Sequence, residues 1–345
     1  MSCTTEMNNI IEERYQLCIS LYLIKKETDK RNKEKRKRGE TNLVYIDIFA
    51  IPSHLKILFG PFLKTPQYTQ IVTMRGHTNN VFCLTIHNNK LYSGSGDNTI
   101  RIWNTETYEE IATLRGHTYR VSCLTLHENK LFSGSWDNTI RVWNTETHEE
   151  IATLGGHTHW VSCLTLHENK LFSGSFDGTI RIWNTETYET IATLRVHTGC
   201  VDCITLHENK LYSGCDDSII RIWNTETYQQ IATLEGHIGR VRCITLHENK
   251  LFSGSDDSII RIWNTETYEE IATLEGHIDS VRCLTFHENK LYSGSYNTTI
   301  RIWNTETYEQ ITILIGHTNW VQCLTLQENK LVSGSEDETI RIWRV

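Results

Sequence analysis

Histidine, serine and aspartate recur in this chain at a spacing that resembles the order of a catalytic triad. One such set consists of His117, Ser133 and Asp137. A serine activated by histidine and aspartate is the nucleophile of many hydrolases, but a triad is defined by geometry, which spacing alone does not establish. The combination also returns at a regular step along the chain, and seven hydrolytic centres would serve no purpose. These residues therefore require a structural explanation first.

The step at which these residues return is 40 residues, and two residue types mark it. Tryptophans stand at Trp103, Trp143, Trp183, Trp223, Trp263, Trp303 and Trp343. Histidines stand at His77, His117, His157, His197, His237, His277 and His317. Self-similarity at about 40 residues is typical of architectures that are built from repeated units.

Each copy reads as four short strands. In the second copy, VSCLTLH and LFSGS are separated by the turn at Asn129, where we expect a positive φ. TIRVWN and EEIATL follow, and alternation of apolar with polar residues favours strands over helices. A four-stranded antiparallel sheet has two faces to bury, and a closed ring of sheets buries both.

The motifs of each copy resemble those of the WD-repeat β-propeller family. The GH near the start of each copy, the SGSxDxTIRxW near its end and the 40-residue step carry the resemblance, over residues 68–345. Six copies have Trp-Asn, as at Trp103, and the last has Trp-Arg in place of Trp-Asp; we expect the asparagine to cap the following turn equally well. The resemblance implies an all-β fold, a seven-bladed propeller with four antiparallel strands per blade.

The same resemblance assigns the histidine set to the frame of the blade. It implies a buried chain of hydrogen bonds from Trp143 through Ser133 and His117 to Asp137, with Ser133 preferred to Ser135. The donors and acceptors match, because an indole only donates and a carboxylate only accepts. Two copies depart from the pattern, with Cys215 in blade four and Asn297 in blade six. We expect the amide oxygen of Asn297 to accept from the histidine of its blade, without the charge of an aspartate. We expect those two blades to be the least stable.

The two ends of the repeat array predict how the ring closes. The last copy ends after its third strand, at TIRIWRV, while the stretch QYTQIVTMR at residues 67–75 precedes the first GH and matches the usual fourth strand. The N-terminal side therefore supplies the missing strand of blade seven. We place the propeller at residues 67–345 and an N-terminal extension, partly helical and basic, at residues 1–66.

Positions that differ between copies belong to one face of the expected ring. They are the two residues before the first strand, the residue after its valine and the residue before the turn aspartate, whereas the loops HENK and NTET hardly change. Aromatic and arginine side chains at such positions are typical of protein interfaces. We expect the tryptophans among them to be exposed until a partner covers them; the alternative is that single aromatic side chains pack on the loops of the next blade. The candidate partner-binding residues are Tyr119, Arg120, Trp136, His159, Trp160, Phe176, Arg240, Arg242, Arg282, Tyr296 and Trp320.

Charge and cysteine usage narrow the class of protein. The net charge is −8; residues 1–66 hold 12 of the 34 Lys/Arg and 8 of the 42 Asp/Glu, which leaves 22 basic and 34 acidic residues for the propeller. An acidic body disfavours nucleic acid as the partner. No apolar run approaches the length of a membrane span.

Seven of the 11 cysteines occupy one repeat position, so we expect buried free thiols and a reducing compartment.

Three alternatives concern particular segments. Cys200 and Cys203 form a CxxC near His197 and Cys215, which could bind zinc, but Cys203 is the ordinary strand cysteine, so we expect no metal and no cofactor. Residues 51–63 faintly resemble the start of an F-box, the adaptor that links propellers to ubiquitin ligases. Residues 25–40 carry nine basic residues and would suit either a solvated stretch or a nuclear-import signal.

Taken together, the sequence predicts a non-catalytic scaffold that binds proteins or peptides on one propeller face. The alternative is the substrate-recognition subunit of a ubiquitin ligase. We expect a cytoplasmic or nuclear location, and a monomer that functions within a larger complex.

Overall fold

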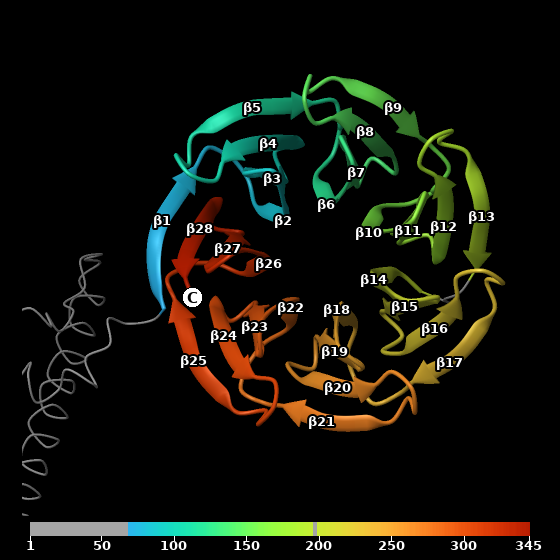
Figure 1. Cartoon of the computed structure of the whole chain (residues 1–345), viewed down its shortest axis with the longest axis vertical. Helices are drawn as coiled ribbons and strands as arrows, with labels where there is room; N and C mark the ends of the chain where they lie inside the picture. Colours follow the sequence, from blue (N-terminus) through green and yellow to red (C-terminus); the bar gives the residue numbers. More distant parts are fainter. Residues whose placement is uncertain (1–67, 196–198) are drawn as a thin grey trace, which may run out of the picture. The chain divides into compact units, whose positions relative to one another are not determined.

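The computed structural model describes residues 68–195 and 199–345, which belong to the unit Gln67–Val345. In this part of the chain every regular element is a β-strand, and the strands form seven four-stranded antiparallel sheets. The sheets surround a central opening as the blades of a ring (Figure 1). This confirms the all-β, seven-bladed propeller that the repeat predicts.

The strands have the same order in every blade, from the central opening outwards. The innermost are β2 (Val81–His87), β6 (Val121–His127), β10 (Val161–His167), β14 (Val201–His207), β18 (Val241–His247), β22 (Val281–His287) and β26 (Val321–Gln327). The second are β3 (Lys90–Ser95), β7 (Lys130–Ser135), β11 (Lys170–Ser175), β15 (Lys210–Cys215), β19 (Lys250–Ser255), β23 (Lys290–Ser295) and β27 (Lys330–Ser335). The third are β4 (Thr99–Asn104), β8 (Ile140–Asn144), β12 (Thr179–Asn184), β16 (Ile220–Asn224), β20 (Ile260–Asn264), β24 (Thr299–Asn304) and β28 (Thr339–Arg344). The outermost are β5 (Glu110–Arg115), β9 (Glu150–Leu154), β13 (Thr190–Arg195), β17 (Gln230–Leu234), β21 (Glu270–Leu274), β25 (Gln310–Ile315) and β1 (Thr69–Arg75).

The hydrophobic core lies between neighbouring blades. Phe132 and Ile140 of blade two pack with Val161, Leu171 and Trp183 of blade three, and equivalent clusters recur around the ring. The second strand is buried on both faces because it is sandwiched between flanking strands and flanking blades. Each blade thus supplies half of two cores, which explains why a single copy would be unstable alone.

Ring closure joins the two ends of the propeller. β1 pairs antiparallel with β28, from Thr69 opposite Arg344 to Arg75 opposite Thr339. The sheet order is β1-β28-β27-β26, so blade seven contains strands from both ends of the described chain (Figure 1). Met74 of β1 is buried in the cluster shared with blade one. This confirms the predicted source of the missing fourth strand.

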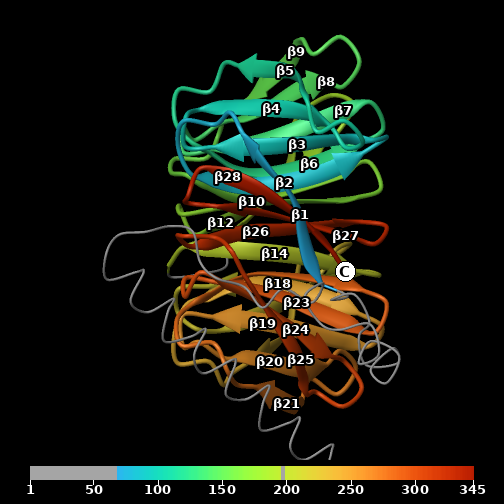
Figure 2. The same cartoon turned by 90° about the vertical axis from the view of Figure 1, so that its left-hand side faces the viewer.

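The two faces of the ring carry different turns, as the edge-on view of Figure 2 allows the reader to follow. One face carries the loop between the first and second strands. There the positive φ, 52°, belongs to Glu128 and not to Asn129 as the sequence suggested. The Asn129 carbonyl instead accepts a 2.9 Å hydrogen bond from the Thr145 backbone, which ties this turn to the next one. In blade one the equivalent Asn89 has a positive φ of 58° and its carbonyl accepts the same bond, from the Thr105 backbone, so the expected conformation occurs there and not at Asn129.

Asparagine caps the turn that follows the third strand. The Asn144 side-chain oxygen accepts hydrogen bonds from the backbone nitrogens of Glu146, at 2.8 Å, and Thr147, at 2.9 Å. The carboxylate of an aspartate would accept the same two bonds. Asn144 therefore does what we expected of the residue that replaces the aspartate of the Trp-Asp pair.

The repeat cysteines act as small apolar side chains at the blade junctions. The Cys83 thiol contacts the carbonyl of Val121 in the next blade at 3.7 Å. Burial raises the pKa of the Cys83 thiol, so it stays protonated. The cysteines that the structure describes are all free. In the same residues no helix has the length and apolar character needed to cross a membrane. The predicted N-terminal helix and F-box-like stretch lie outside the described residues.

Candidate functional site

The variable positions lie at one face because of the strand register. Val121 pairs with Ser135, and the Trp136 backbone nitrogen donates a 3.1 Å hydrogen bond to the Arg120 carbonyl. The loop before the first strand and the loop after the second strand are therefore adjacent. Equivalent bonds join Phe176 to Trp160 and Tyr296 to Ser280. The antiparallel pairing places the nearly constant HENK and NTET loops at the opposite ends of the same strands.

The repeated histidine set forms a hydrogen-bonded chain inside the blade. In blade two, Trp143 Nε1 donates to Ser133 Oγ at 2.8 Å, and Ser133 Oγ lies 2.8 Å from His117 Nε2. The other ring nitrogen of His117 lies 2.7 Å from Asp137 Oδ2. Ser135 instead donates to the Tyr119 carbonyl and accepts from the Asp137 backbone nitrogen. The serine hydroxyl lies between two rings and is 0% exposed, so it has no access to a substrate.

The aspartate of this chain is ionised in the fold. Burial acts against its charge, but the hydrogen bond from His117 and the bonds from Thr139 and the Thr118 backbone lower the pKa of Asp137 well below its usual range. Asp97, Asp177 and Asp337 have the same partners and the same direction of shift. These charged, fully bonded groups stabilise the blade and leave no free acid or base.

Blade six reverses the direction of the chain. We expected the amide oxygen of Asn297 to accept from His277, but the amide nitrogen faces His277 Nδ1 at 3.1 Å. The amide oxygen is occupied by Thr299, whose hydroxyl donates to it at 2.6 Å. His277 Nδ1 therefore accepts, and Nε2 donates to Ser293 Oγ at 2.7 Å. Burial, with the charge of Arg301, lowers the pKa of His277 to about 4.

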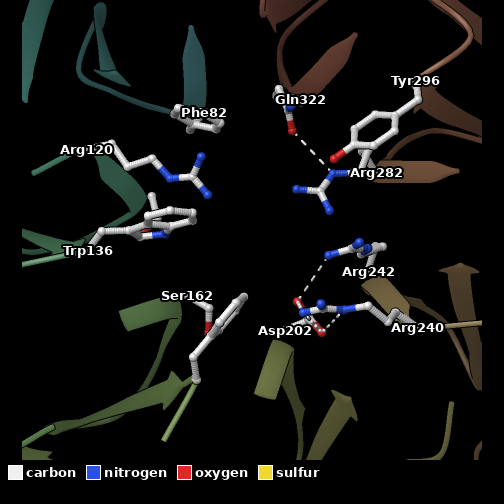
Figure 3. Close-up of a pocket in the computed structure, with 12 residues that line it drawn as sticks. Phe82, Arg120, Trp136, Ser162, Asp202, Arg240, Arg242, Arg282, Tyr296 and Gln322 are labelled. Carbon is white, nitrogen blue, oxygen red and sulfur yellow. Dashed lines mark hydrogen bonds and ion pairs between the residues drawn. The ribbon is translucent and has the colours of Figure 1, made fainter. Parts of the chain in front are cut away.

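The variable positions line a cavity of about 350 Å³ at the centre of the ring. Figure 3 shows side chains from opposite sides of the ring pointing into it. Twelve residues line it: Phe82, Arg120, Ser122, Trp136, Ser162, Phe176, Asp202, Arg240, Arg242, Arg282, Tyr296 and Gln322. The volume falls in the range of small-molecule and side-chain binding pockets.

Aromatic side chains of blades two and three form one wall of this face. The rings of Trp136 and Trp160 are stacked with centroids 3.3 Å apart and an interplanar angle of 6°. Phe176 lies 5.3 Å from Trp160, and His159 lies 6.0 Å from Phe176. We expected exposed tryptophans, but these two are half-buried because they cover each other across the blade boundary. A second stack, of Tyr296 on Trp320 at 3.8 Å, joins blades six and seven.

Two arginines of the cavity are held by carboxylates. Arg240 binds Asp202 with both Nη2, at 2.8 Å, and Nε, at 3.2 Å. Arg242 binds Asp256 through Nε and Nη2, each at 2.7 Å. Hydrogen bonds from Arg242 and Ser280 lower the pKa of Asp256 against the effect of burial. These bidentate pairs fix both guanidinium groups across the boundary between blades four and five and within blade five.

The other two arginines have no carboxylate partner in the described residues. Arg120 lies between rings, with its guanidinium carbon 3.0 Å from the centroid of Trp136 and 4.2 Å from that of Phe82. Arg282 donates to Gln322 Oε1 at 3.2 Å and lies 5.1 Å from the Tyr296 ring. Burial and the charge of Arg282 lower the pKa of Arg120. The pair therefore leaves positive charge uncompensated at the cavity.

Seven of the eleven predicted binding residues line the cavity, and four do not. His159, Trp160 and Trp320 contact lining residues from outside, whereas Tyr119 is 63% exposed. The binding prediction omitted five lining residues, Phe82, Ser122, Ser162, Asp202 and Gln322, which all follow the first valine of their blades. The variation at that repeat position was the signal that could have found them. These five residues line the cavity because their position lies on the innermost strand of each blade.

Two isoleucines were not identified from the sequence. Ile238 is 87% exposed and Ile278 is 86% exposed, in adjacent blades five and six. Both follow the repeat histidine directly, where other copies have a threonine such as Thr118. The Ile238 backbone nitrogen bonds to Asp257, which places this position beside the turn aspartate. The departure from threonine at one repeat position was a signal that could have found them.

The possible zinc ligands of blade four are only partly described, because His197 lies outside the described residues. Cys203 is buried, and Cys215 contacts Asp216 Oδ1 at 3.1 Å. Among the residues that the structure describes, no cluster of three or more His, Cys, Asp or Glu side chains is arranged to hold a metal ion.

Comparison with known proteins agrees with this geometry. A family model described as WD domain, G-beta repeat, matches residues 68–104, 108–144, 148–184, 188–224, 228–264, 268–304 and 308–344. A similar solved structure is that of the computationally designed Ika8 protein, with a TM-score of 0.66 and 26% identity over 80% of this chain and 99% of that one.

A curated relative shares one short region with the chain. It is described as the probable E3 ubiquitin ligase complex SCF subunit sconB of Emericella nidulans, and it is 57% identical over 37 residues. The match spans 11% of this chain and 6% of the length of that protein. The family model, in contrast, matches most of this chain, repeat by repeat, and each match contains the outermost strand of one blade and the three inner strands of the next. The chain therefore belongs to the WD-repeat family.

Proposed function

We propose that the chain is a non-catalytic interaction module that binds a protein or peptide partner at the variable face of the propeller. The observation that supports this most strongly is the arrangement of the differences between copies. Residues that differ gather around one cavity, whereas the exposed loops of the opposite face are nearly identical in every copy. Random drift of exposed positions would have changed both faces.

The chemistry of the variable face suits a protein partner. Trp136, Tyr296 and Trp320 are amphipathic rings held in stacks, so little side-chain entropy is lost when a partner covers them. Ile238 and Ile278 add exposed apolar area on neighbouring blades. The histidine sets are buried in the frame, which supports a non-catalytic role.

Affinity purification with the full chain as bait tests this proposal. The double substitution Trp136→Ala/Trp160→Ala removes the larger stack, and we expect it to abolish recovery of the partners that the unaltered chain enriches. A matched control in the same two blades, Glu146→Ala/Glu186→Ala, changes the opposite face and should recover them fully. Equal recovery by both variants, with both folded by circular dichroism, would overturn the proposal.

A ubiquitin ligase subunit is the second candidate function, and one observation favours it. The 37-residue similarity is to a protein described as a subunit of a ubiquitin ligase complex. In this version the variable face binds the substrate, and residues 51–63 begin the adaptor-binding segment. Co-purification of a ligase adaptor with the full chain, and its loss when residues 1–66 are deleted, is the expected result. Absence of any adaptor from the full-chain preparation would remove this candidate.

A further inference from the structure

The cavity contains two guanidinium groups with unused hydrogen-bond donors. No acceptor within the described residues contacts the guanidinium of Arg120, and its Nε is buried without a partner. Arg282 uses Nε for Gln322, and none of its remaining donors has a partner in the same residues. In Figure 3 the two groups point towards each other from opposite sides of the cavity. Guanidinium donors that face a cavity and have no acceptor in the described residues can form charge-assisted hydrogen bonds to an anion there, so this arrangement favours an anion.

The charged groups around the cavity indicate how many negative charges the anion carries. Four arginines line it, and the carboxylates in hydrogen-bond contact with lining residues are Asp202, Asp256 and Glu336, the last through a 2.7 Å bond from Gln322. Asp202 and Asp256 neutralise Arg240 and Arg242. Glu336 is left to balance two arginines, so the hydrogen-bonded groups have one excess positive charge, and the nearby charge of Asp216, which acts on Arg240, reduces this excess. A monoanion compensates it, whereas a dianion would overcompensate.

The walls of the cavity indicate what carries the anion. Phe82, Trp136, Phe176 and Tyr296 all contribute rings to the lining. Arg120 cannot move freely, because Trp136 and Phe82 hold it on both sides. A fixed guanidinium loses little entropy on forming a bidentate bond to a planar acceptor.

We propose that this cavity binds a carboxylate borne on a flat apolar group, with the carboxylate between Arg120 and Arg282 and the apolar part against Phe176 and the uncovered edges of Phe82 and Trp136. The carboxylate comes either from a free aromatic acid or from an acidic side chain beside an aromatic one in a peptide partner. The second source deepens the proposed function and rests on it. The test below uses small probes and needs no partner, so the two proposals fail separately.

Isothermal titration of the full chain with three phenyl compounds tests the charge class. We expect phenylacetate to bind, its uncharged analogue phenylacetamide not to bind, and phenyl phosphate to bind more weakly than phenylacetate. A second arm uses N-acetyl-Phe-Glu-amide and its Gln analogue; binding of the Glu form alone assigns the carboxylate to a peptide side chain. Equal binding of phenylacetate and phenylacetamide, tighter binding of phenyl phosphate, or binding of no carboxylate probe would overturn the inference.

Substitutions locate the site. Arg282→Gln should lower the affinity for the bound carboxylate probe at least tenfold, as expected for loss of a charged hydrogen bond. Arg282→Lys keeps the charge and should restore part of the affinity, which separates loss of charge from misfolding. Arg115→Gln, at an exposed outer strand, is the matched control and should have no effect. Unchanged probe affinity in folded Arg120→Gln/Arg282→Gln would contradict the site, and unchanged partner recovery by that variant would leave the proposed function standing.

Discussion

The two faces of the ring come from the same repeat, but the residues of one face are nearly constant between copies and those of the other face vary. At the face of the constant loops, Lys130 of blade two donates to the Thr185 carbonyl of blade three at 3.1 Å and lies 5.4 Å from the Tyr188 ring. Lys330 lies over Tyr108 in the same way where blade seven meets blade one. At the other face each blade carries a different set of residues at the variable positions. The contacts that join blades therefore recur at the constant face, whereas at the variable face they differ from one boundary to the next, as with the Trp136–Trp160 stack and the Arg240–Asp202 pair.

The largest expected effect comes from breaking the frame at its closure. Deleting residues 67–75 removes β1 with its buried Met74, leaves the pairing edge of β28 open and uncovers the core that Met74 packs against. We expect a loss of more than about 5 kcal/mol in the free energy of unfolding, from lost apolar burial and ladder bonds. Differential scanning calorimetry should show a broad, lowered transition. Deletion of residues 1–66 keeps β1 and serves as the control; an unchanged cooperative transition in the first variant would refute closure.

The next effect comes from breaking one hydrogen-bonded chain. Ser133→Ala leaves the Trp143 indole nitrogen and the His117 Nε2 without their shared partner inside the blade. Each unsatisfied buried group costs about 1–3 kcal/mol, so we expect roughly 2–4 kcal/mol of destabilisation. Urea denaturation measures it, with exposed Tyr119→Ala as the control. A change below about 0.5 kcal/mol for Ser133→Ala would show that the chain does not stabilise the blade.

Blade six allows the frame to be strengthened instead. Asn297→Asp should let His277 donate to a carboxylate, as His117 does to Asp137 in blade two. The wild-type His277 pKa of about 4 lies below that of the unfolded chain, so the wild type loses stability as pH falls from about 6.5 to 4. The carboxylate should raise this pKa and remove the loss. We expect the variant to have a higher free energy of unfolding than the wild type. This difference should be roughly 2 kcal/mol larger at pH 5 than at pH 7.5.

Urea denaturation at the two pH values and an NMR titration of His277 test this prediction. Amide exchange in blade six should also slow in the variant, since we expect blades four and six to open most readily in the wild type. A variant whose stability relative to the wild type is the same at both pH values would show that Asn297 does not control His277.

Much of the fold follows from the repeat, but the site follows only in part. The 40-residue step and the unmatched ends predicted the blades and β1 as the closing strand. The hydrogen-bonded chain came with the resemblance to WD repeats, and the preference for Ser133 is confirmed, although Ser135 has the same donor and acceptors. The pairing of Arg240 with Asp202 was not predicted, because these residues are 38 positions apart and meet only when two blades are placed side by side. The enclosure of Arg120 by Phe82 and Trp136 likewise depends on the radius of the ring.

The smallest expected effect on stability concerns the exposed isoleucines. Ile238→Thr/Ile278→Thr restores the residue found in other copies, and both side chains are almost fully exposed. We expect a change within about 0.5 kcal/mol, as for ordinary surface substitutions. Recovery of partners in the affinity purification should fall if this patch belongs to the interface. Full recovery would confine the interface to the cavity and its aromatic rim.

Replacing the variable residues of one blade by those of another tests the central claim most directly. The residues Asn79, Asn80, Phe82 and Gly96 occupy in blade one the variable positions of blade two. Placing them in blade two, as Tyr119→Asn, Arg120→Asn, Ser122→Phe and Trp136→Gly, keeps the frame and changes only the face. Thermal melting and partner recovery should be measured on the same preparation. We predict a midpoint within a few degrees of the wild type and loss of partner recovery; a collapsed fold, or undiminished recovery, would contradict the separation of frame from face.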